Sequence, residues 1–201
     1  MNYYSVAKGN TIGFFTSCEK SVKKFNNEKD TIKYINNNQK PFINNQLYNT
    51  ADNIDYFVYT DGACSNNGKK NANAAIGIYF GLNDNRNLSK KIIGKQTNNI
   101  AELSAIIDAY KIIETDLLLG KNICIVTDSE YSLKCITSYG EKNYKNNWQT
   151  NIKNKELVKE IFLLFHNKKN IKFLLVRAHT NKTDIHSIGN NNADKLAKLV
   201  L

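Results

Sequence analysis

One stretch of the chain decides the fold, and it reads Tyr56-Phe57-Val58-Tyr59-Thr60-Asp61-Gly62-Ala63-Cys64. It opens with an unbroken run of aromatic and β-branched side chains, which is typical of a β-strand covered on both faces. Asp61 then places a charge at the end of this apolar run. A buried carboxylate is costly unless it is paired or holds a metal ion. Taken alone, Asp61-Gly62 is more simply explained as the start of a turn, so the metal-ligand interpretation depends on other carboxylates.

The composition fits one ordinary domain with an appendage. The 201 residues are 41% hydrophobic, which suffices for a core, and no apolar run reaches the length of a membrane span. The formal net charge is +10, which predicts a polyanionic partner, with nucleic acid first and an anionic membrane surface second. A soluble basic surface without any such partner has the same net charge.

The cysteines and the N-terminus predict an intracellular protein, cytoplasmic or nuclear rather than secreted. No C-x-x-C spacing joins Cys18, Cys64, Cys124 and Cys135, so reduced thiols are expected. No basic segment followed by an apolar one begins the chain, so no signal peptide is evident. The bias toward Asn and Lys is compatible with the AT-rich genome of a microbe or a virus.

The order of the predicted elements indicates an α/β fold with a mixed five-stranded sheet, an antiparallel meander followed by parallel strands, flanked by helices. After the first strand, strands are expected over 73–80, 87–95, 123–127 and 171–176. Helices are expected over 98–118, 129–137, 157–165 and 193–200. The helix over 98–118 has the clearest period, with an apolar stripe beside a row of alanines.

The chain divides into three parts by composition. Residues 1–35 form a small α+β unit, with a hairpin over 3–6 and 11–16 and a short helix near 31–35. Residues 36–54 are polar and hold the only proline, which indicates a linker. Residues 55–201 form the larger domain.

Four carboxylates stand at the ends of predicted core elements: Asp61 and Asp128 end strands, and Glu102 and Asp194 lie in the first turns of helices. Capping and helix-dipole roles explain each of them singly. Together they would repel one another unless hard cations with oxygen ligands, Mg²⁺ or Mn²⁺, lay between them. Two such ions roughly 3.5–4 Å apart suit in-line attack on a phosphodiester. Zinc is disfavoured, because the chain has 3 histidines and no paired thiols.

Four segments in order resemble the motifs of the type 1 ribonuclease H family over residues 55–201. They are Tyr59–Gly68, Gly94–Leu103, Val126–Ser129, and Ala178–Thr180 with Gly189–Ala197. The resemblance implies hydrolysis of the RNA strand of RNA–DNA hybrids with two Mg²⁺ ions, leaving 5′-phosphate and 3′-hydroxyl ends. One ion would activate a water and the other would stabilise the leaving 3′ oxygen. The metal ligands would be Asp61, Glu102, Asp128 and Asp194.

The same resemblance implies the remaining site residues. His179 would assist proton transfer and product release, with His186 in the same loop as the alternative. The 2′-hydroxyls of the RNA strand would be read by Cys64, Asn66, Asn67, Asn98 and Asn99. The DNA strand would be bound at a phosphate by Lys95, Thr97 and Asn146, and at a sugar by Tyr139. The basic segment 141–155, with Tyr144 and Trp148, resembles the basic protrusion of longer members.

The N-terminal unit resembles a shortened hybrid-binding domain, with Ser17-Cys18 where that domain has a tryptophan. It is expected to contact nucleic acid, the larger domain or another protein, in a chain expected to be a monomer without membrane contact. Two other functions are weighed against the hybrid nuclease. A non-catalytic nucleic-acid-binding module is disfavoured, because converging carboxylates repel phosphate. A DNA-cutting nuclease on the same scaffold is disfavoured by the asparagine-rich loops, since asparagine suits hydroxyl recognition.

Overall fold

The computed structural model describes residues 3–6, 14–15, 22–25, 53–178 and 183–201. The burial and contacts of side chains are described for residues 53–178 and 183–201. The larger sheet is made of β4 (Tyr56–Ser65), β5 (Asn73–Tyr79), β6 (Leu88–Lys91), β7 (Ile123–Thr127) and β8 (Ile171–Leu175). The described helices are α2 (Asn98–Leu118), α3 (Glu130–Ile136), α4 (Ser138–Lys145), α5 (Lys155–Phe165) and α6 (Ile185–Lys198).

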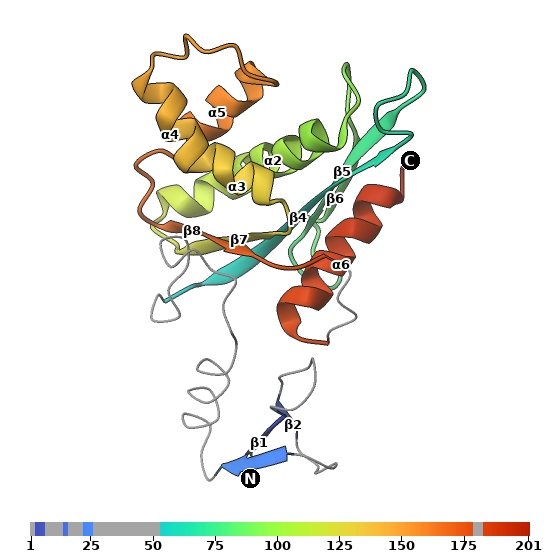
Figure 1. Cartoon of the computed structure of the whole chain (residues 1–201). Coiled ribbons are helices and arrows are strands. Elements are labelled where there is room, and N and C mark those ends of the chain that lie inside the picture. The colour runs from blue at the N-terminus through green and yellow to red at the C-terminus, as the bar shows by residue number, and fades with distance from the viewer. Residues whose placement is uncertain (1–2, 7–13, 16–21, 26–52, 179–182) are drawn as a thin grey trace.

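The strands form a mixed sheet in the order β6-β5-β4-β7-β8 (Figure 1). β4, β5 and β6 pair antiparallel, whereas β4, β7 and β8 pair in parallel. Figure 1 shows α2, α3, α4 and α5 on one side of this sheet and α6 on the other. The predicted α/β fold with a mixed five-stranded sheet is therefore confirmed.

The first strand is longer than its apolar run. Asp61 was expected to end it, but β4 continues to Ser65 and remains paired with β5 up to Asn73. The parallel pairing on the other side of β4 stops earlier, at Tyr59 opposite Val126. The expectation fails because β5 keeps supplying hydrogen-bond partners to the polar end of β4, which a residue pattern within β4 does not reveal.

Helix α2 packs on the sheet with the predicted face. Its apolar stripe is buried: Ile100, Leu103, Ile106, Ile107, Tyr110 and Ile113. The alanine row beside the stripe, Ala101, Ala105 and Ala109, is 0% exposed, so the helix backbone lies close to its neighbours. Fully burying one such isoleucine or leucine contributes about 1.5–3 kcal/mol, which fixes α2 and the residues at its start.

Helix α6 covers the opposite face over a smaller apolar cluster, made of Tyr59, Cys124, Val126, Leu174 and Ala193. The sequence predicts this helix over 193–200, and that start is wrong, because α6 begins at Ile185. Asp184 caps it by accepting hydrogen bonds from the backbone N–H groups of His186 and Ser187 and from the Ser187 hydroxyl. Capping supports a helix start that the polar composition of the segment conceals.

The N-terminal residues form a separate three-stranded sheet in the order β2-β1-β3, made of β1 (Tyr3–Val6), β2 (Phe14–Phe15) and β3 (Val22–Phe25). β1 pairs antiparallel with β2, as the strands of the predicted hairpin would, and residues 7–13 between them lie outside the described residues. The predicted short helix near 31–35 and most of the linker lie outside the described residues. None of the helices in the described ranges combines the length and apolar character that a membrane span requires.

Candidate active site

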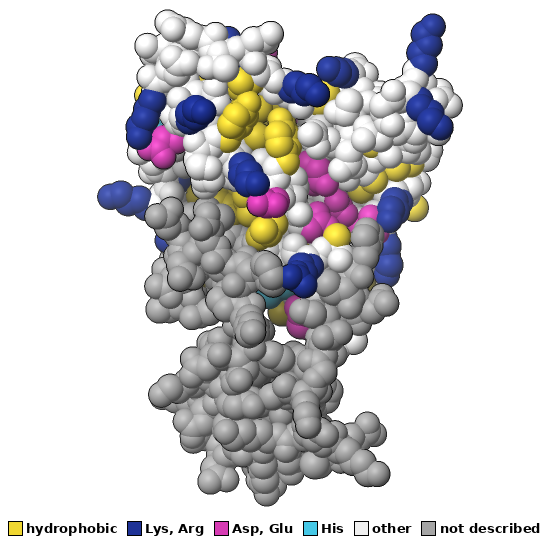
Figure 2. All heavy atoms as spheres, in the orientation of Figure 1, with side chains coloured by type: hydrophobic (Ala, Val, Ile, Leu, Met, Phe, Trp, Pro, Cys, Tyr) yellow, Lys and Arg dark blue, Asp and Glu magenta, His cyan; other side chains and the backbone are white. Residues whose placement is uncertain are grey.

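Three of the predicted carboxylates meet. Asp61, Glu102 and Asp128 each offer an oxygen within 4.8 Å of the others. Asp61 and Glu102 are each only 7% exposed, and Asp128 is half-buried. Figure 2 shows acidic side chains gathered near the middle of one face, with lysine and arginine side chains around them. Of the three carboxylates, Asp128 is the most accessible.

The sheet itself brings Asp61 and Asp128 together. Tyr59 and Val126 are the last paired residues of the parallel β4–β7 ladder. Asp61 lies two positions after Tyr59, and Asp128 lies two positions after Val126. Side chains two apart on a strand point to the same face, so equal offsets place the two carboxylates side by side. They stand where β4 continues along β5 but has lost β7, and the open end of a sheet between diverging strands is a common ligand site.

Helix α2 brings the third carboxylate through a close approach to β4. Glu102 is the fifth residue of α2, one turn deeper than the predicted first turn. Gly62 faces the start of this helix, and a Cβ there would lie 2.3 Å from the Glu102 backbone nitrogen and 2.5 Å from the Ala101 carbonyl carbon. Only glycine permits this distance between backbones, so Gly62 determines how close Glu102 comes to Asp61.

Helix α6 presents its polar groups to the site at intervals of four residues. Asn190 donates a hydrogen bond from Nδ2 to Oδ2 of Asp128 at 2.9 Å. Asp194 lies next along the same face, and its charge acts on Asp61. It is the tenth residue of α6, so the prediction that it lies in the first turn is wrong. The Lys198 ammonium lies 2.7 Å from Oδ1 and 2.8 Å from Oδ2 of Asp194.

The carboxylates disfavour one another's ionisation. Burial is the largest cause that raises the pKa of Asp61 to about 8, and the charges of Asp128 and Asp194 raise it further. Burial also raises the pKa of Glu102 well above its usual range, and the charges of Asp61 and Asp128 add to this. Buried like charges retain protons unless a cation compensates them, so this cluster is built for a positively charged occupant.

The donor set fits a metal ion. Glu102 Oε1 accepts a long hydrogen bond, 3.4 Å from Asn98 Nδ2, and Glu102 Oε2 is buried with no hydrogen-bond partner among the described residues. The Gly62 backbone N–H lowers the pKa of Glu102, but burial raises it more. A buried unpaired carboxylate oxygen is costly, and a coordinated cation would remove that cost. Asp61, Glu102 and Asp128 can therefore hold a metal ion with oxygen ligands.

The structure describes one of the two candidate histidines, His186. His186 packs edge-on against Phe57 with ring centroids 4.7 Å apart, and its Nδ1 lies 3.4 Å from the Tyr59 hydroxyl. Burial lowers the pKa of His186, which keeps the ring neutral. At about 1.5 Å of rise per residue, it lies roughly 12 Å along α6 from Asp194. His186 thus anchors the start of α6, while His179 lies outside the described residues.

The structure brings together two of the predicted RNA-reading loops. Asn67 Oδ1 accepts a hydrogen bond from the Asn98 backbone N–H at 3.2 Å, which joins the turn after β4 to the start of α2. Through its side chain, Asn98 reaches Glu102 as well. Thr97 is the N-cap of α2 and accepts from the Ile100 N–H at 3.2 Å. Capping of α2 by Thr97 is compatible with its predicted contact to a DNA phosphate, because one hydroxyl can accept one hydrogen bond and donate another.

The other predicted contacts are more scattered. Asn66, Asn99 and Lys95 are exposed near these loops, and Cys64 is half-buried in β4. Asn146 ends α4 and donates to Thr150 Oγ1 at 2.8 Å, while Tyr139 is half-buried in α4; among the described residues, no hydrogen bond ties either to Lys95 or Thr97.

Trp148 does not form part of an exposed binding face in the basic segment. It is 8% exposed and packs against Phe162, with ring centroids 6.1 Å apart. Tyr144, in contrast, is 44% exposed. The tryptophan therefore anchors the segment to the core, and the segment's exposed side chains are chiefly its lysines and asparagines.

Two residues that support the site or its neighbouring loop, Asn190 and Gln96, are not among the predicted site residues. Asn190 is 3% exposed and holds Asp128, and its position four residues before Asp194 is the pattern that could have indicated it. Gln96 accepts from the Ala74 N–H at 2.6 Å and donates to the carbonyls of Ile92 and Gly94, which fixes the loop before α2. No local pattern indicates the contact between Gln96 and Ala74, because Ala74 lies on another strand, β5.

Replacing Asn190 should weaken metal binding. Asn190→Ala removes the donor that orients Asp128, and loss of such a partner typically lowers metal affinity about 10–100-fold. Asn143→Ala is the control, since Asn143 is also 3% exposed but donates to the Tyr139 carbonyl in α4. Calorimetric titration with Mg²⁺ or Mn²⁺ should show a loss only for Asn190→Ala. Equal affinities in both variants would mean that Asn190 does not support the site.

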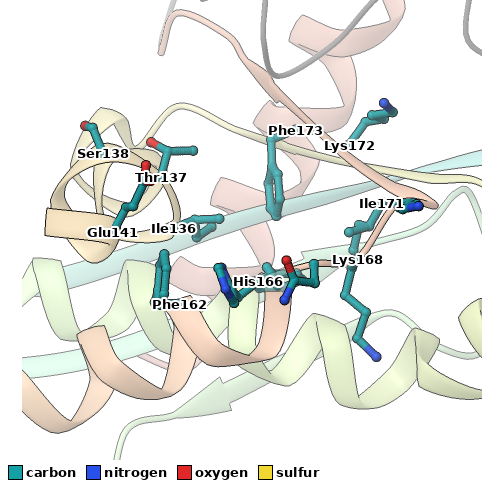
Figure 3. A pocket seen from close by; sticks show the side chains of 13 residues that line it. Ile136, Thr137, Ser138, Glu141, Phe162, His166, Lys168, Ile171, Lys172 and Phe173 are labelled. Atoms are coloured by element: carbon teal, nitrogen blue, oxygen red, sulfur yellow. The ribbon is translucent and has the colours of Figure 1, made fainter. Parts of the chain in front are cut away.

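A separate hollow of about 620 Å³ lies away from the carboxylates. It is lined by Ile136, Thr137, Ser138, Glu141, Phe162, Phe165, His166, Asn167, Lys168, Lys169, Ile171, Lys172 and Phe173. Figure 3 shows the ammonium groups of Lys168 and Lys172 directed away from the middle of this hollow. These two ammonium groups therefore do not converge on the hollow.

Comparison with known proteins identifies the family and the fold. The sequence model of the family described as RNase H matches residues 53–201. Ribonuclease H of Clostridium botulinum (strain Hall) is 35% identical over 145 residues, which cover 70% of this chain and 91% of that protein. Ribonuclease H of Schizosaccharomyces pombe is 38% identical over 146 residues, covering 70% of this chain and 51% of that one.

A solved structure agrees with these relatives. The solution structure of the RNase H domain of PFV, prototype foamy virus, superposes with a TM-score of 0.59 at 26% identity, covering 74% of this chain and 94% of that domain. The family match covers the residues that carry the four motifs and the meeting carboxylates. The chain therefore belongs to the ribonuclease H family.

Proposed function

We propose that the chain is an endoribonuclease that hydrolyses the RNA strand of RNA–DNA hybrids and leaves 5′-phosphate and 3′-hydroxyl ends. One observation carries the proposal: three buried or half-buried carboxylates from β4, α2 and the end of β7 meet within 4.8 Å in a chain of the ribonuclease H family. A module that only bound nucleic acid would gain nothing from this cluster, since the cluster repels phosphate.

The proposed metal is Mg²⁺, bound as two ions, with Mn²⁺ as the alternative. The ligands would be Asp61, Glu102, Asp128 and Asp194, an oxygen-only set of the kind that these hard cations prefer. When bound, two such ions supply an activated water and stabilise the leaving oxygen of the phosphodiester.

The chain's own groups would set up the reaction. Asp61 meets Glu102 and Asp128 within 4.8 Å, and the amide of Asn190 donates to one oxygen of Asp128. The fold fixes all these groups before substrate arrives, which lowers the barrier by positioning. His179, in the loop before α6, is proposed to assist proton transfer and product release.

Substrate choice is proposed to rest on the minor groove of the hybrid, where the 2′-hydroxyls of the RNA strand are displayed. The bonded pair Asn67 and Asn98 would read them beside the carboxylates, together with Cys64, Asn66 and Asn99. The neighbouring DNA strand would be held by Lys95, Thr97, Asn146 and Tyr139. The net charge of +10 supports binding of a polyanion.

The proposed organisation is a catalytic domain over 55–201, a linker over 36–54 and a hybrid-binding-like unit over 1–35. The unit would contact nucleic acid or protein, and the chain would act as a monomer. The three-stranded sheet formed by β1, β2 and β3 supports a folded unit at this end of the chain.

A labelled hybrid tests the proposed function directly. Incubated with Mg²⁺, it should yield shortened RNA fragments whose 3′ ends a polymerase can extend, and removal of the metal by a chelator should stop cleavage until metal is restored. Single-stranded RNA, duplex RNA and duplex DNA are the controls. An intact RNA strand in a bound hybrid would identify a binding module instead, and cleavage of duplex DNA would identify a DNA nuclease.

A further inference from the structure

One face of α6 carries an amide, a carboxylate and an ammonium at successive positions. Asn190, Asp194 and Lys198 are each four residues apart, so their side chains follow one another along the same side of the helix. Asn190 donates a hydrogen bond to Asp128, and Lys198 forms an ion pair with Asp194. The charge of Asp194 raises the pKa of Asp61. Lys198 is the member of this series that has no role in the proposed function.

Lys198 engages both oxygens of Asp194. Its Nζ lies 2.7 Å from Oδ1 and 2.8 Å from Oδ2, and the charge of Lys198 also lowers the pKa of Asp61. Among the described residues, no ion pair holds Asp61, Glu102 or Asp128. Asp194 thus differs from the other carboxylates, because the chain itself supplies its counter-ion.

Asp194 also stands apart in position. The carboxylates that meet within 4.8 Å are Asp61, Glu102 and Asp128, and Asp194 is not among them. An ion held by Asp194 would compete with the ammonium for the same two oxygens. The Lys198 side chain is 55% exposed, so it can move into solvent when a cation takes its place.

We infer that Lys198 is a built-in competitor for the divalent cation at Asp194, which must displace the ammonium before Asp194 can coordinate it. The inference rests on the proposed function, in which Asp194 is a metal ligand. In the metal-free protein Lys198 relieves repulsion between Asp194 and Asp61. The consequence is a higher metal requirement at the Asp194 side of the site than the carboxylates alone would set.

The simpler explanation is an ordinary i, i+4 ion pair near a helix C-terminus, where a lysine also interacts favourably with the helix dipole. Lys134 provides the comparison, because it forms an i, i+4 pair with Glu130 at 2.8 Å in α3. A pair that serves only its helix contributes to helix stability but has no effect on metal affinity. The two explanations therefore differ in a measurable quantity.

Calorimetric titration with Mg²⁺, and separately with Mn²⁺, of the full chain tests the inference. Lys198→Met should tighten metal binding about two- to fivefold, the fold-change that corresponds to an exposed ion pair. The Mg²⁺ concentration for half-maximal hybrid cleavage should fall by the same factor, and the metal-free protein should melt at a lower temperature. Lys198→Arg, which keeps the charge, and Lys134→Met should retain the native affinity.

The double variant Lys198→Met with Asp194→Asn tests whether the effect of Lys198 on metal affinity depends on Asp194. If Lys198 acts through Asp194, the gain in metal affinity disappears in the Asp194→Asn background, and a gain that persists there overturns the inference. Unchanged or weaker binding in Lys198→Met, while the native chain binds metal and cleaves hybrid, overturns the inference alone. A native chain that binds no divalent ion and leaves the hybrid intact overturns the proposed function, and the inference with it.

Discussion

Asp61→Asn should reduce hybrid cleavage about 1,000-fold or more while making the metal-free protein more stable. The loss follows from removing one of the proposed metal ligands, since metal stabilisation of the transition state is worth several kcal/mol and each 1.36 kcal/mol is about tenfold in rate. The gain follows from removing a buried acid beside Asp128 and Asp194 that has to take up a proton when the chain folds near neutral pH. Stability and activity should therefore change in opposite directions in one variant.

The pH dependence gives the sign of the stability effect. The pKa of Asp61 rises from 3.8 to about 8 on folding. Between these values the unfolded chain has released a proton that the folded chain keeps, so raising the pH destabilises the native protein across this window. An asparagine has no such proton, so Asp61→Asn should flatten this decline and gain about 1–3 kcal/mol near pH 7 without metal.

Asp108→Asn is the matched control for this substitution. Asp108 lies in α2 and pairs with Lys90 and Lys111, away from the carboxylates that meet. The control should keep native cleavage rates and lose about 1 kcal/mol, because both lysines that pair with Asp108 are more than half exposed. Chemical denaturation from pH 5 to pH 8, with and without Mg²⁺, gives the stabilities. An Asp61→Asn protein that cleaves at the native rate would remove Asp61 from the metal site.

Gly77→Ala should destabilise the protein by about 3 kcal/mol or more and displace α6. A Cβ at Gly77 would lie 2.0 Å from the Ala193 carbonyl oxygen and 2.5 Å from the Ala197 nitrogen. Both are backbone atoms of α6, so the helix has to move away from β5, and overpacking of this kind typically costs about 1–3 kcal/mol even where side chains can yield. The shift should carry Asp194 with it, so cleavage should fall in the fraction that remains folded.

Gly81→Ala separates this contact from the general effect of replacing a glycine. Gly81 lies just after β5, where a Cβ would have no heavy atom within 4 Å among the described residues, and its backbone conformation is one that other residues adopt. Its substitution should change the free energy of unfolding by less than about 0.5 kcal/mol, as is usual for open surface positions. Denaturant unfolding of both variants measures the difference. Equal stabilities would mean that α6 does not rest on β5 as described.

Much of the fold follows from local patterns. The stripe from Ile100 to Ile113 predicts α2 with its observed bounds, and the apolar run from Ile123 predicts β7. These elements could be predicted because their signal is a periodicity or a run within one segment. The start of α6 and the length of β4 could not, because a cap at Asp184 and a neighbouring strand decide them.

The sequence by itself determined which four acidic residues to consider, the order of the strands and helices, and the resemblance to one family. Only the tertiary structure decided that Asp61, Glu102 and Asp128 meet, that Asn190 supports one of them, and that Lys198 holds Asp194. The physical reason is distance along the chain. These contacts depend on where β7 stops pairing with β4 and on how closely α2 and α6 approach the sheet at Gly62 and Gly77. No single segment of the sequence contains that information.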